Sequence, residues 1–153
     1  YFDTTVGLVH DHILSILVTS DGVVWFGTLG GVSRLTPDSM WRTYTRASGL
    51  AADTVLDVAL GSDGSIWFGT NFGASRLAID GTWENITTQD GLAGNYVWAI
   101  ASTPDDRLWF GTDAGASRLN PDGAWRTYTV RDGLPNEEVR AIAATSDGTI
   151  WFA

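Results

Sequence analysis

The stretch DGSIWFGT, residues 63–70, recurs through the chain at a constant interval and decides its fold. Its tryptophan, Trp67, has counterparts at Trp25, Trp109 and Trp151, so that one tryptophan of this kind occurs every 42 residues. No insertion or deletion breaks this interval, so the chain is a tandem array with one fixed geometry per repeat. Counted from the Gly-Leu that opens each unit, a stub at 1–6 precedes full repeats at 7–48, 49–90 and 91–132 and a truncated repeat at 133–153.

The composition indicates a folded protein and argues against several classes of function. Hydrophobic residues make up 44% of the 153 residues, and eight tryptophans supply material for a core. The net charge of −9 argues against nucleic-acid binding, which needs clustered cations. Cysteine and lysine are both absent, which excludes disulfides, thiolate chemistry and lysine Schiff bases. No apolar run approaches the roughly 20 residues of a membrane-spanning helix, so we expect no membrane contact by this segment.

The interior of the second repeat predicts four strands, at 54–60, 65–70, 74–78 and 82–87. The tripeptides SDG and IDG mark tight turns after the first and third of them. The first strand is apolar on both faces, with Leu56 and Val58 expected on one face and Val55 and Ala59 on the other. Such a strand is expected to lie between two sheets.

Four-stranded antiparallel sheets, one per repeat of about 40 residues, describe a β-propeller. Leucine-rich and β-helical solenoids have shorter repeats with fewer strands, and they do not account for two turn signals in each repeat. The predicted fold is therefore an all-β propeller array of four-stranded antiparallel blades, with about 3.6 repeats of 42 residues in this chain.

At this level of detail the chain resembles the two-component-regulator propeller repeat family. The resemblance is carried by GLAADTVLDVALGSDGSIWFGTNFGASRL at 49–77 and by DGLPNEEVRAIAATSDGTIWF at 132–152. It implies a sensor domain of a bacterial two-component system, in the periplasm or outside the cell, that recognises carbohydrate-derived ligands. The chain departs from the family pattern at the asparagine before the first strand, where only Asn95 keeps that residue.

The chain is also similar to virginiamycin-B-lyase-like propellers, which carry DGxxWF once per repeat. That resemblance implies a lyase with a histidine general base beside a divalent metal. The chain has Gly-Thr after Trp-Phe where the lyase repeat has Thr-Glu, and its only histidines are His10 and His12. With Asp11, these histidines lack a fourth metal ligand. We therefore predict no enzyme, no metal site and no cofactor, and keep the lyase as the weaker alternative.

Candidate ligand-binding residues lie in the connections opposite the tight turns. We expect GTNFGAS at 69–75 and TQDGLAGNY at 88–96 to form the longer loops, and ligands to bind on their face. The candidates differ between repeats on an otherwise regular scaffold, namely Asp53, Asn71, Asn95, Tyr96, Trp98, Asp113 and Asn136. Tyr96 and Trp98 could stack on a sugar, or Trp98 could fill the gap between sheets.

The two ends of the array predict further partners. The truncated repeat supplies first and second strands, at 139–145 and 149–153, and the stub aligns with the fourth strand of other repeats. Because an unpaired apolar blade invites association, we expect other blades to cover it, from a longer polypeptide or from further copies in a ring or filament. A chain that begins at Tyr1 is expected to be a processed or excised piece. The predicted function is non-enzymatic recognition outside the cytoplasm; the alternative is a structural module that assembles with other copies.

Overall fold

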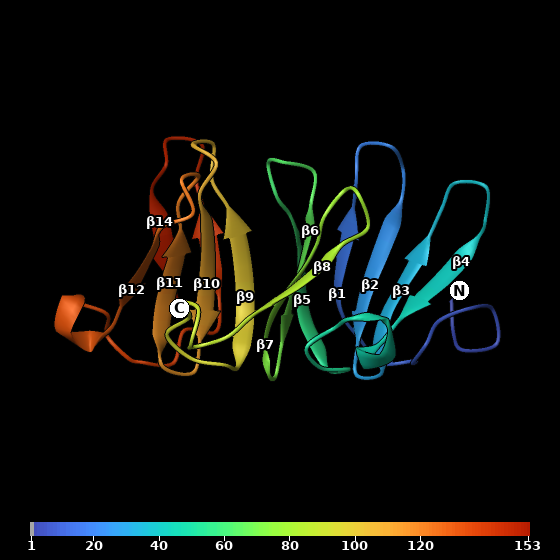
Figure 1. Cartoon of the computed structure of the whole chain (residues 1–153), viewed down its shortest axis with the longest axis horizontal. Helices are drawn as coiled ribbons and strands as arrows, with labels where there is room; N and C mark the ends of the chain where they lie inside the picture. The colour runs from blue at the N-terminus through green and yellow to red at the C-terminus, as the bar shows by residue number, and fades with distance from the viewer. Residues whose placement is uncertain (1) are drawn as a thin grey trace.

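The computed structural model describes residues 2–153 and contains four antiparallel sheets, which we call blades 1 to 4 (Figure 1). Blade 1 comprises β1 (Ile13–Val18), β2 (Val24–Thr28), β3 (Gly31–Leu35) and β4 (Trp41–Tyr44). Blade 2 comprises β5 (Val55–Leu60), β6 (Ile66–Thr70), β7 (Gly73–Leu77) and β8 (Trp83–Ile86). Blade 3 comprises β9 (Val97–Ser102), β10 (Leu108–Thr112), β11 (Gly115–Leu119) and β12 (Trp125–Tyr128). Blade 4 has two strands, β13 (Ile142–Ala144) and β14 (Ile150–Phe152).

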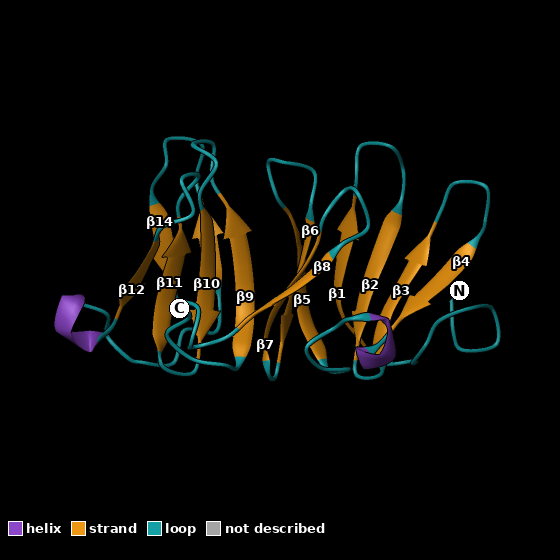
Figure 2. Ribbon diagram, viewed as in Figure 1, coloured by secondary structure: helices purple, strands orange, loops and turns teal. Residues whose placement is uncertain are grey.

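The predicted all-β propeller fold is confirmed. Strands follow one another in chain order within each blade, and the first strands β1, β5, β9 and β13 lie next to one another across the blades. The only helical segments in the described chain are two 3₁₀ turns, η1 (Arg46–Ser48) and η2 (Val130–Asp132), shown in Figure 2. None of the helical structure among residues 2–153 has the length and apolarity of a membrane span.

The connections divide between two ends of the blades. The turns between the first and second strands and between the third and fourth lie at one end, upper in Figure 1, which we call the turn end. The hairpins between second and third strands and the segments between blades lie at the other, the connection end.

One predicted loop is wrong. GTNFGAS was expected to form a longer loop, but only residues 71–72 separate β6 from β7. The Thr70 hydroxyl donates to the Gly73 carbonyl at 2.8 Å and accepts the Phe72 N–H at 3.1 Å, closing the hairpin. Gly73 has a φ of 108°, a conformation that disfavours a side chain. The long segments at the connection end are therefore only those between blades.

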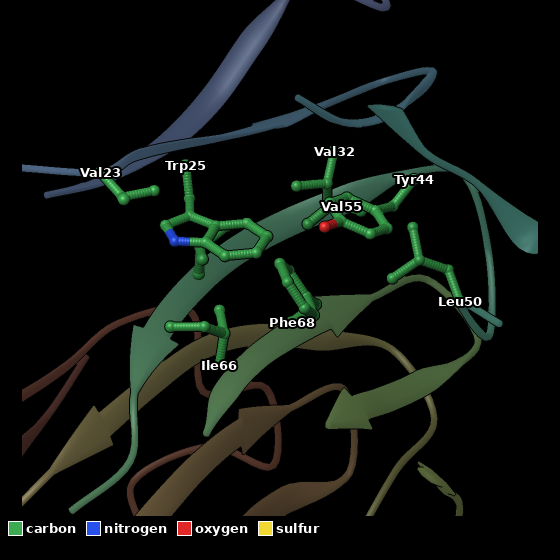
Figure 3. Close-up of a cluster of buried hydrophobic side chains, with 9 residues drawn as sticks. Val23, Trp25, Val32, Tyr44, Leu50, Val55, Ile66 and Phe68 are labelled. Carbon is green, nitrogen blue, oxygen red and sulfur yellow. The ribbon is translucent and has the colours of Figure 1, made fainter. Parts of the chain in front are cut away.

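The core lies between blades (Figure 3). Val23, Trp25, Val32 and Tyr44 of blade 1 pack against a second set, Leu50, Val55, Val58, Ile66 and Phe68, from blade 2. Trp25 and Phe68 have ring centroids 5.8 Å apart. Trp67 and Phe110 repeat this contact at 5.4 Å in the next interface. The second-strand tryptophan of each complete blade thus reaches the phenylalanine of the following blade.

The faces expected for the first strand of blade 2 need correction. Val55 and Val58 lie on the same side, in contact with blade 1, because the register shifts between Val55 and Asp57. A bulge of this kind adds one residue on one strand and reverses the alternation beyond it. Ala59 faces blade 3 as expected.

The outer faces of blades 1 and 4 are uncovered in this chain. Ile16 on β1 is 57% exposed, whereas its counterpart Val58 is 6% exposed. Trp151 on β14 is 65% exposed, whereas Trp67 is 3% exposed. Within the stub, residues 2–6 form no strand, but the Phe2 ring lies 5.5 Å from Trp41. Tyr1 lies outside the described residues.

In the three complete repeats, the opening glycine packs against a tryptophan of the fourth strand. Gly49 follows η1 with a φ of 122°, and a Cβ there would lie 2.5 Å from Trp83 Cγ. Gly133 follows η2 with a φ of 106°, but nothing lies within 4 Å of its Cβ position. Blade 4 lacks the fourth strand that would carry the tryptophan.

Alanine variants at these two glycines distinguish the energetic cost of backbone strain from that of lost packing. We expect Gly133→Ala to lower the free energy of unfolding by about 1–2 kcal/mol, the cost of a left-handed alanine. Gly49→Ala should cost about 1–3 kcal/mol more, because the methyl group also displaces Trp83. Urea denaturation of the two variants measures both values. Equal losses would contradict the packing role of Gly49.

Asp57 joins the first strands of three blades. Its Oδ1 accepts the Ser15 hydroxyl of blade 1 at 2.8 Å and the Val58 N–H at 2.9 Å. Its Oδ2 accepts the Ile100 N–H of blade 3 at 2.7 Å. Burial raises the pKa of Asp57 above its ordinary value of 3.8, and these hydrogen bonds offset only part of that effect.

Removing this carboxyl group should destabilise the protein in a pH-dependent way. Asp57→Ala leaves the Ile100 N–H without its acceptor and should lower the free energy of unfolding by about 1–3 kcal/mol. A raised pKa means that the folded protein holds the proton more tightly than the unfolded chain. The free energy of unfolding of the wild type should therefore exceed that of Asp57→Ala most below pH 4, and this difference should decline as the pH rises through the raised pKa of Asp57. Unfolding free energies of both proteins at pH 4 and pH 7 measure this, and a larger advantage at pH 7 would be inconsistent with the raised pKa.

Candidate functional site

Two of the predicted binding residues close the segments between blades. Asp53 Oδ1 accepts the N–H of Arg46 at 2.7 Å. Asn95 Oδ1 accepts the N–H of Thr88 at 2.9 Å, at the same spacing of seven residues. An aspartate and an asparagine serve equally here because each presents an oxygen acceptor. This shared hydrogen bond explains why the repeat tolerates either residue at that position.

The remaining polar candidates also lie at the connection end. Asp113 Oδ1 accepts the N–H of Tyr96 at 3.1 Å, which ties the β10–β11 hairpin to the start of β9. Asn136 Oδ1 accepts the N–H of Glu138 at 3.3 Å in the segment before blade 4. Asn71 is exposed in the β6–β7 hairpin. The structure therefore gathers all the predicted residues at one end but not into a single pocket.

Four side chains at this end form a continuous group, which we call the aromatic–arginine cluster. The rings of Tyr96 and Trp98 lie 4.2 Å apart with an interplanar angle of 38°. The Arg140 guanidinium carbon lies 5.1 Å from the Trp98 ring. Arg140 also pairs with Glu138, with Nη2 and Oε1 2.9 Å apart. The cluster thus runs from blade 3 to blade 4.

Sequence reasoning found half of this cluster. Tyr96 and Trp98 are predicted from the sequence, whereas Glu138 and Arg140 are not. The signal was present, because Glu138 and Arg140 occupy the same repeat positions 42 residues later. Equivalent positions on neighbouring first strands lie side by side in a propeller, so departures from the repeat at both positions meet in space.

The cluster offers stacking surfaces and hydrogen-bond donors together. Tyr96 and Trp98 are both half-buried, so part of each ring faces solvent. Trp98 Nε1 is buried without a hydrogen-bond partner among the described residues. Arg140 keeps its side chain 67% exposed despite its pair with Glu138. Aromatic faces and an accessible guanidinium group suit a ligand with one apolar face and several oxygen atoms.

The turn end carries two clefts, one at each interface between complete blades. The cleft between blades 1 and 2 measures about 630 Å³ and includes Arg34 and Arg42. The cleft between blades 2 and 3 measures about 470 Å³ and includes Asp63 and Arg76. Ligand sites were predicted only at the opposite end, so sequence reasoning missed both clefts. Each is formed by residues from two consecutive repeats.

An ion-pair network borders the second cleft. Arg76 Nη2 lies 2.5 Å from Asp63 Oδ2, and Arg76 Nη1 lies 3.4 Å from Glu84 Oε2. Partial burial opposes ionisation of Asp63, but hydrogen bonds from Ser65 and Arg76 outweigh it and lower the pKa to about 2. Asp63 is therefore a carboxylate throughout the physiological pH range.

The histidines near the N-terminus contact each other. The rings of His10 and His12 lie 5.3 Å apart in an edge-on arrangement. His10 Nδ1 accepts the N–H of His12 at 3.0 Å, and Asp11 Oδ1 accepts the N–H of Thr4 at 2.7 Å. Among residues 2–153, no three histidine or carboxylate side chains gather as metal ligands would.

Comparison with known proteins identifies the repeat. The model of the family described as "Two component regulator propeller" matches residues 7–30, 49–72, 91–114 and 133–153. These four matches cover more than half of the chain and fall on the four blades. No curated protein matches the chain significantly.

Solved structures resemble the chain in fold. The extracellular domain assigned to a hybrid two component system of B. thetaiotaomicron has a TM-score of 0.87 at 24% identity, over 99% of this chain and 22% of that one. An extracellular domain assigned to a one component system of the same organism has a TM-score of 0.80 at 21% identity, over 99% of this chain and 21% of that one. This chain spans about a fifth of the length of both.

A third similar structure is an enzyme. Catalytically inactive virginiamycin B lyase from Staphylococcus aureus, solved with quinupristin, has a TM-score of 0.73 at 24% identity, over 92% of this chain and 48% of that one. At these identities the three likenesses concern the arrangement of the blades and carry no information about the ligand.

Proposed function

Because the chain belongs to the two component regulator propeller family, we propose that it is a non-enzymatic recognition segment of a bacterial sensor of the two-component type. The segment works in the periplasm or outside the cell. Two of the structures that share its fold are extracellular domains of such regulatory systems, which supports this assignment. Its role is to bind a ligand and present the bound state to the rest of the sensor.

The observation that carries the proposal is the aromatic–arginine cluster. Residues that recur in every blade serve packing, but the residues of this cluster differ from those at the same repeat positions in blade 2. Tyr96 is equivalent to Thr54, and both Trp98 and Arg140 are equivalent to Leu56. A carbohydrate-like ligand fits this cluster, since the C–H face of a sugar ring stacks on Trp98 while its hydroxyl groups accept hydrogen bonds from Arg140. Asp113 supports the site indirectly by holding the backbone of Tyr96.

The lyase alternative finds less support in the residues. That chemistry was expected to need a histidine general base beside a divalent metal. The two histidines of this chain lie next to each other before β1, and His10 Nδ1 is already occupied by the His12 N–H. A shared fold does not transfer an activity when the reacting groups have no counterparts. We therefore propose recognition without catalysis.

A binding experiment with repeat-derived variants tests the recognition proposal. A panel of oligosaccharides is screened against the chain, and the affinity of each hit is measured by calorimetry. Trp98→Leu introduces the residue of blade 2 and should weaken binding about tenfold or more through loss of about 1.4 kcal/mol of stacking. The melting temperature should change little, because leucine already occupies this position in blades 1 and 2.

Leu56→Ala is the matched control at the same repeat position in another blade, and it should leave binding unchanged. Sugar affinity that survives Trp98→Leu would contradict the proposed site. A large loss of stability in Trp98→Leu would instead assign Trp98 to the scaffold between sheets.

A second candidate function is assembly, which the uncovered blade faces favour. Leu14, Ile16 and Val18 on β1 are between 45% and 62% exposed, and Trp151 is 65% exposed at the opposite end of the array. In the interfaces between complete blades, Trp25 packs on Phe68 and Trp67 packs on Phe110. Trp151 and Phe26 occupy the same repeat positions in the two end blades. The uncovered faces of blades 1 and 4 are therefore complementary to each other. Further blades, from the same polypeptide or from another copy, would cover them.

Light scattering tests this second candidate. We expect the 153-residue chain to exceed its monomer mass of 16.5 kDa at micromolar concentration, because apolar faces of this size favour association. Trp151→Ser should shift the population toward monomer, since Trp151 is the most prominent apolar side chain of its face. A monodisperse 16.5 kDa species of the unmodified chain would refute assembly through these faces.

A further inference from the structure

The cleft between blades 2 and 3 lies at the turn end, opposite the aromatic–arginine cluster. Trp67 and Ile86 of blade 2 form one wall, and Leu108, Leu119 and Trp125 of blade 3 form the other. Its volume of about 470 Å³ suits a small organic ligand or a side chain with adjoining backbone.

Departures from the repeat gather around this cleft. Gly61, Glu84 and Asp106 depart from the residue that the other repeats share, and Asn120 stands at a position that varies between repeats. Their counterparts 42 residues earlier are Thr19, Arg42, Gly64 and Ala78. All four counterparts line the corresponding cleft between blades 1 and 2. The chain therefore contains the same cleft twice, with different polar and charged residues in the two copies.

The alterations reverse the charge of the cleft. The cleft between blades 1 and 2 has one carboxylate, Asp21, and two guanidinium groups, Arg34 and Arg42, for a net charge of +1. The cleft between blades 2 and 3 has one guanidinium group, Arg76, and three carboxylates, for a net charge of −2. These carboxylates are Asp63, Glu84 and Asp106. Only the second cleft has the sign that attracts a cation.

Asp106, which lines this cleft, also has an unusual backbone conformation. It occupies a position that is glycine in the other three repeats and adopts a φ of 61°. A non-glycine residue in this conformation costs roughly 1 kcal/mol. The carboxylate is thus placed at the cleft despite a conformational cost that glycine would avoid.

Two polar atoms in the cleft have no partner among the described residues. Trp67 is 3% exposed, and its Nε1 makes no hydrogen bond. This nitrogen lies at the Gly61 wall of the cleft, where a Cβ on Gly61 would come within 3.1 Å of it. Asn120 Oδ1 is likewise buried and unpaired. Since buried polar groups in proteins are nearly always hydrogen-bonded, this donor and this acceptor are both available to pair with a bound molecule.

We propose that the cleft between blades 2 and 3 binds an organic cation, an ammonium or guanidinium group on an apolar stem with an oxygen acceptor beside it. The cationic group donates to Asn120 Oδ1 and lies near Glu84 and Asp106. The neighbouring oxygen accepts the indole N–H of Trp67. The stem packs between the aliphatic and aromatic walls. Gly61 leaves room for this arrangement, because the threonine of the other repeats would place a side chain beside the indole nitrogen.

Two sources carry this chemistry, a basic side chain of a peptide and a free amino sugar. The probes are Nα-acetyl-lysine amide and glucosamine, each paired with a neutral analogue, Nα-acetyl-norleucine amide and glucose. Binding is followed by the indole N–H resonance of Trp67 in an ¹⁵N-labelled sample of the full chain. We expect this resonance to shift on titration with at least one cation and not with its neutral analogue. Which cation binds identifies the source; equal binding of a neutral analogue, or no binding by either cation, overturns the proposal.

Variants that restore the residue of other repeats test the assignment. Glu84→Arg introduces the residue of blades 1 and 3, and it should raise the dissociation constant about tenfold by reversing a charge that faces the ligand. Gly61→Thr introduces the residue of the other three repeats and should abolish the shift of the Trp67 resonance. Glu137→Arg makes the same charge change on an exposed residue outside the cleft and should leave binding unchanged. Equal effects of Glu84→Arg and Glu137→Arg would show that only net charge matters and would overturn the site.

Discussion

The contact between a tryptophan of one blade and a phenylalanine of the next is the interaction on which the rest of the structure depends. It occurs between Trp25 and Phe68 and again between Trp67 and Phe110, with ring centroids less than 6 Å apart. Adjacent residues on a strand point to opposite faces, so one Trp-Phe pair serves two interfaces. Burial of each ring stabilises its interface by about 2–3 kcal/mol. Most of the core therefore lies between blades, and a blade is stable only beside another.

The glycine after each Trp-Phe pair sets how closely the blades approach. A Cβ on Gly69 would lie 2.9 Å from the Val97 carbonyl oxygen of the next first strand. Gly111 stands in the same relation to Val139, at 2.6 Å. Any side chain at these positions would separate the first strands and weaken the aromatic contacts beyond them. The tripeptide Trp-Phe-Gly thus supplies the aromatic contacts on both faces of a blade and sets the distance to the neighbouring blade.

On such a regular scaffold, both proposed binding sites lie where residues of two neighbouring repeats differ from the pattern and meet. Trp98 on β9, with Tyr96 just before that strand, meets Arg140, which lies just before β13, the next first strand. In the cleft at the opposite end, Glu84 belongs to blade 2 and Asn120 to blade 3. The two groups lie at opposite ends of the blades, so one chain offers two chemically different surfaces, one aromatic and one acidic. Neither changes the Trp-Phe contacts that hold the blades together.

The sequence by itself determined the repeat, the strand order within a blade, the all-β class and the family. Each of these depends on residues that are close in the chain or separated by a fixed 42 residues. It also pointed to Tyr96 and Trp98 as residues outside the pattern. Only the tertiary structure decided that Arg140 lies over Trp98 and that Trp67 Nε1 is left unpaired in a cleft. The bulge that turns Val55 and Val58 to one face was likewise invisible in the alternation of apolar residues. These features depend on which side chains meet across a blade interface, and that is set by packing between repeats rather than by any single repeat.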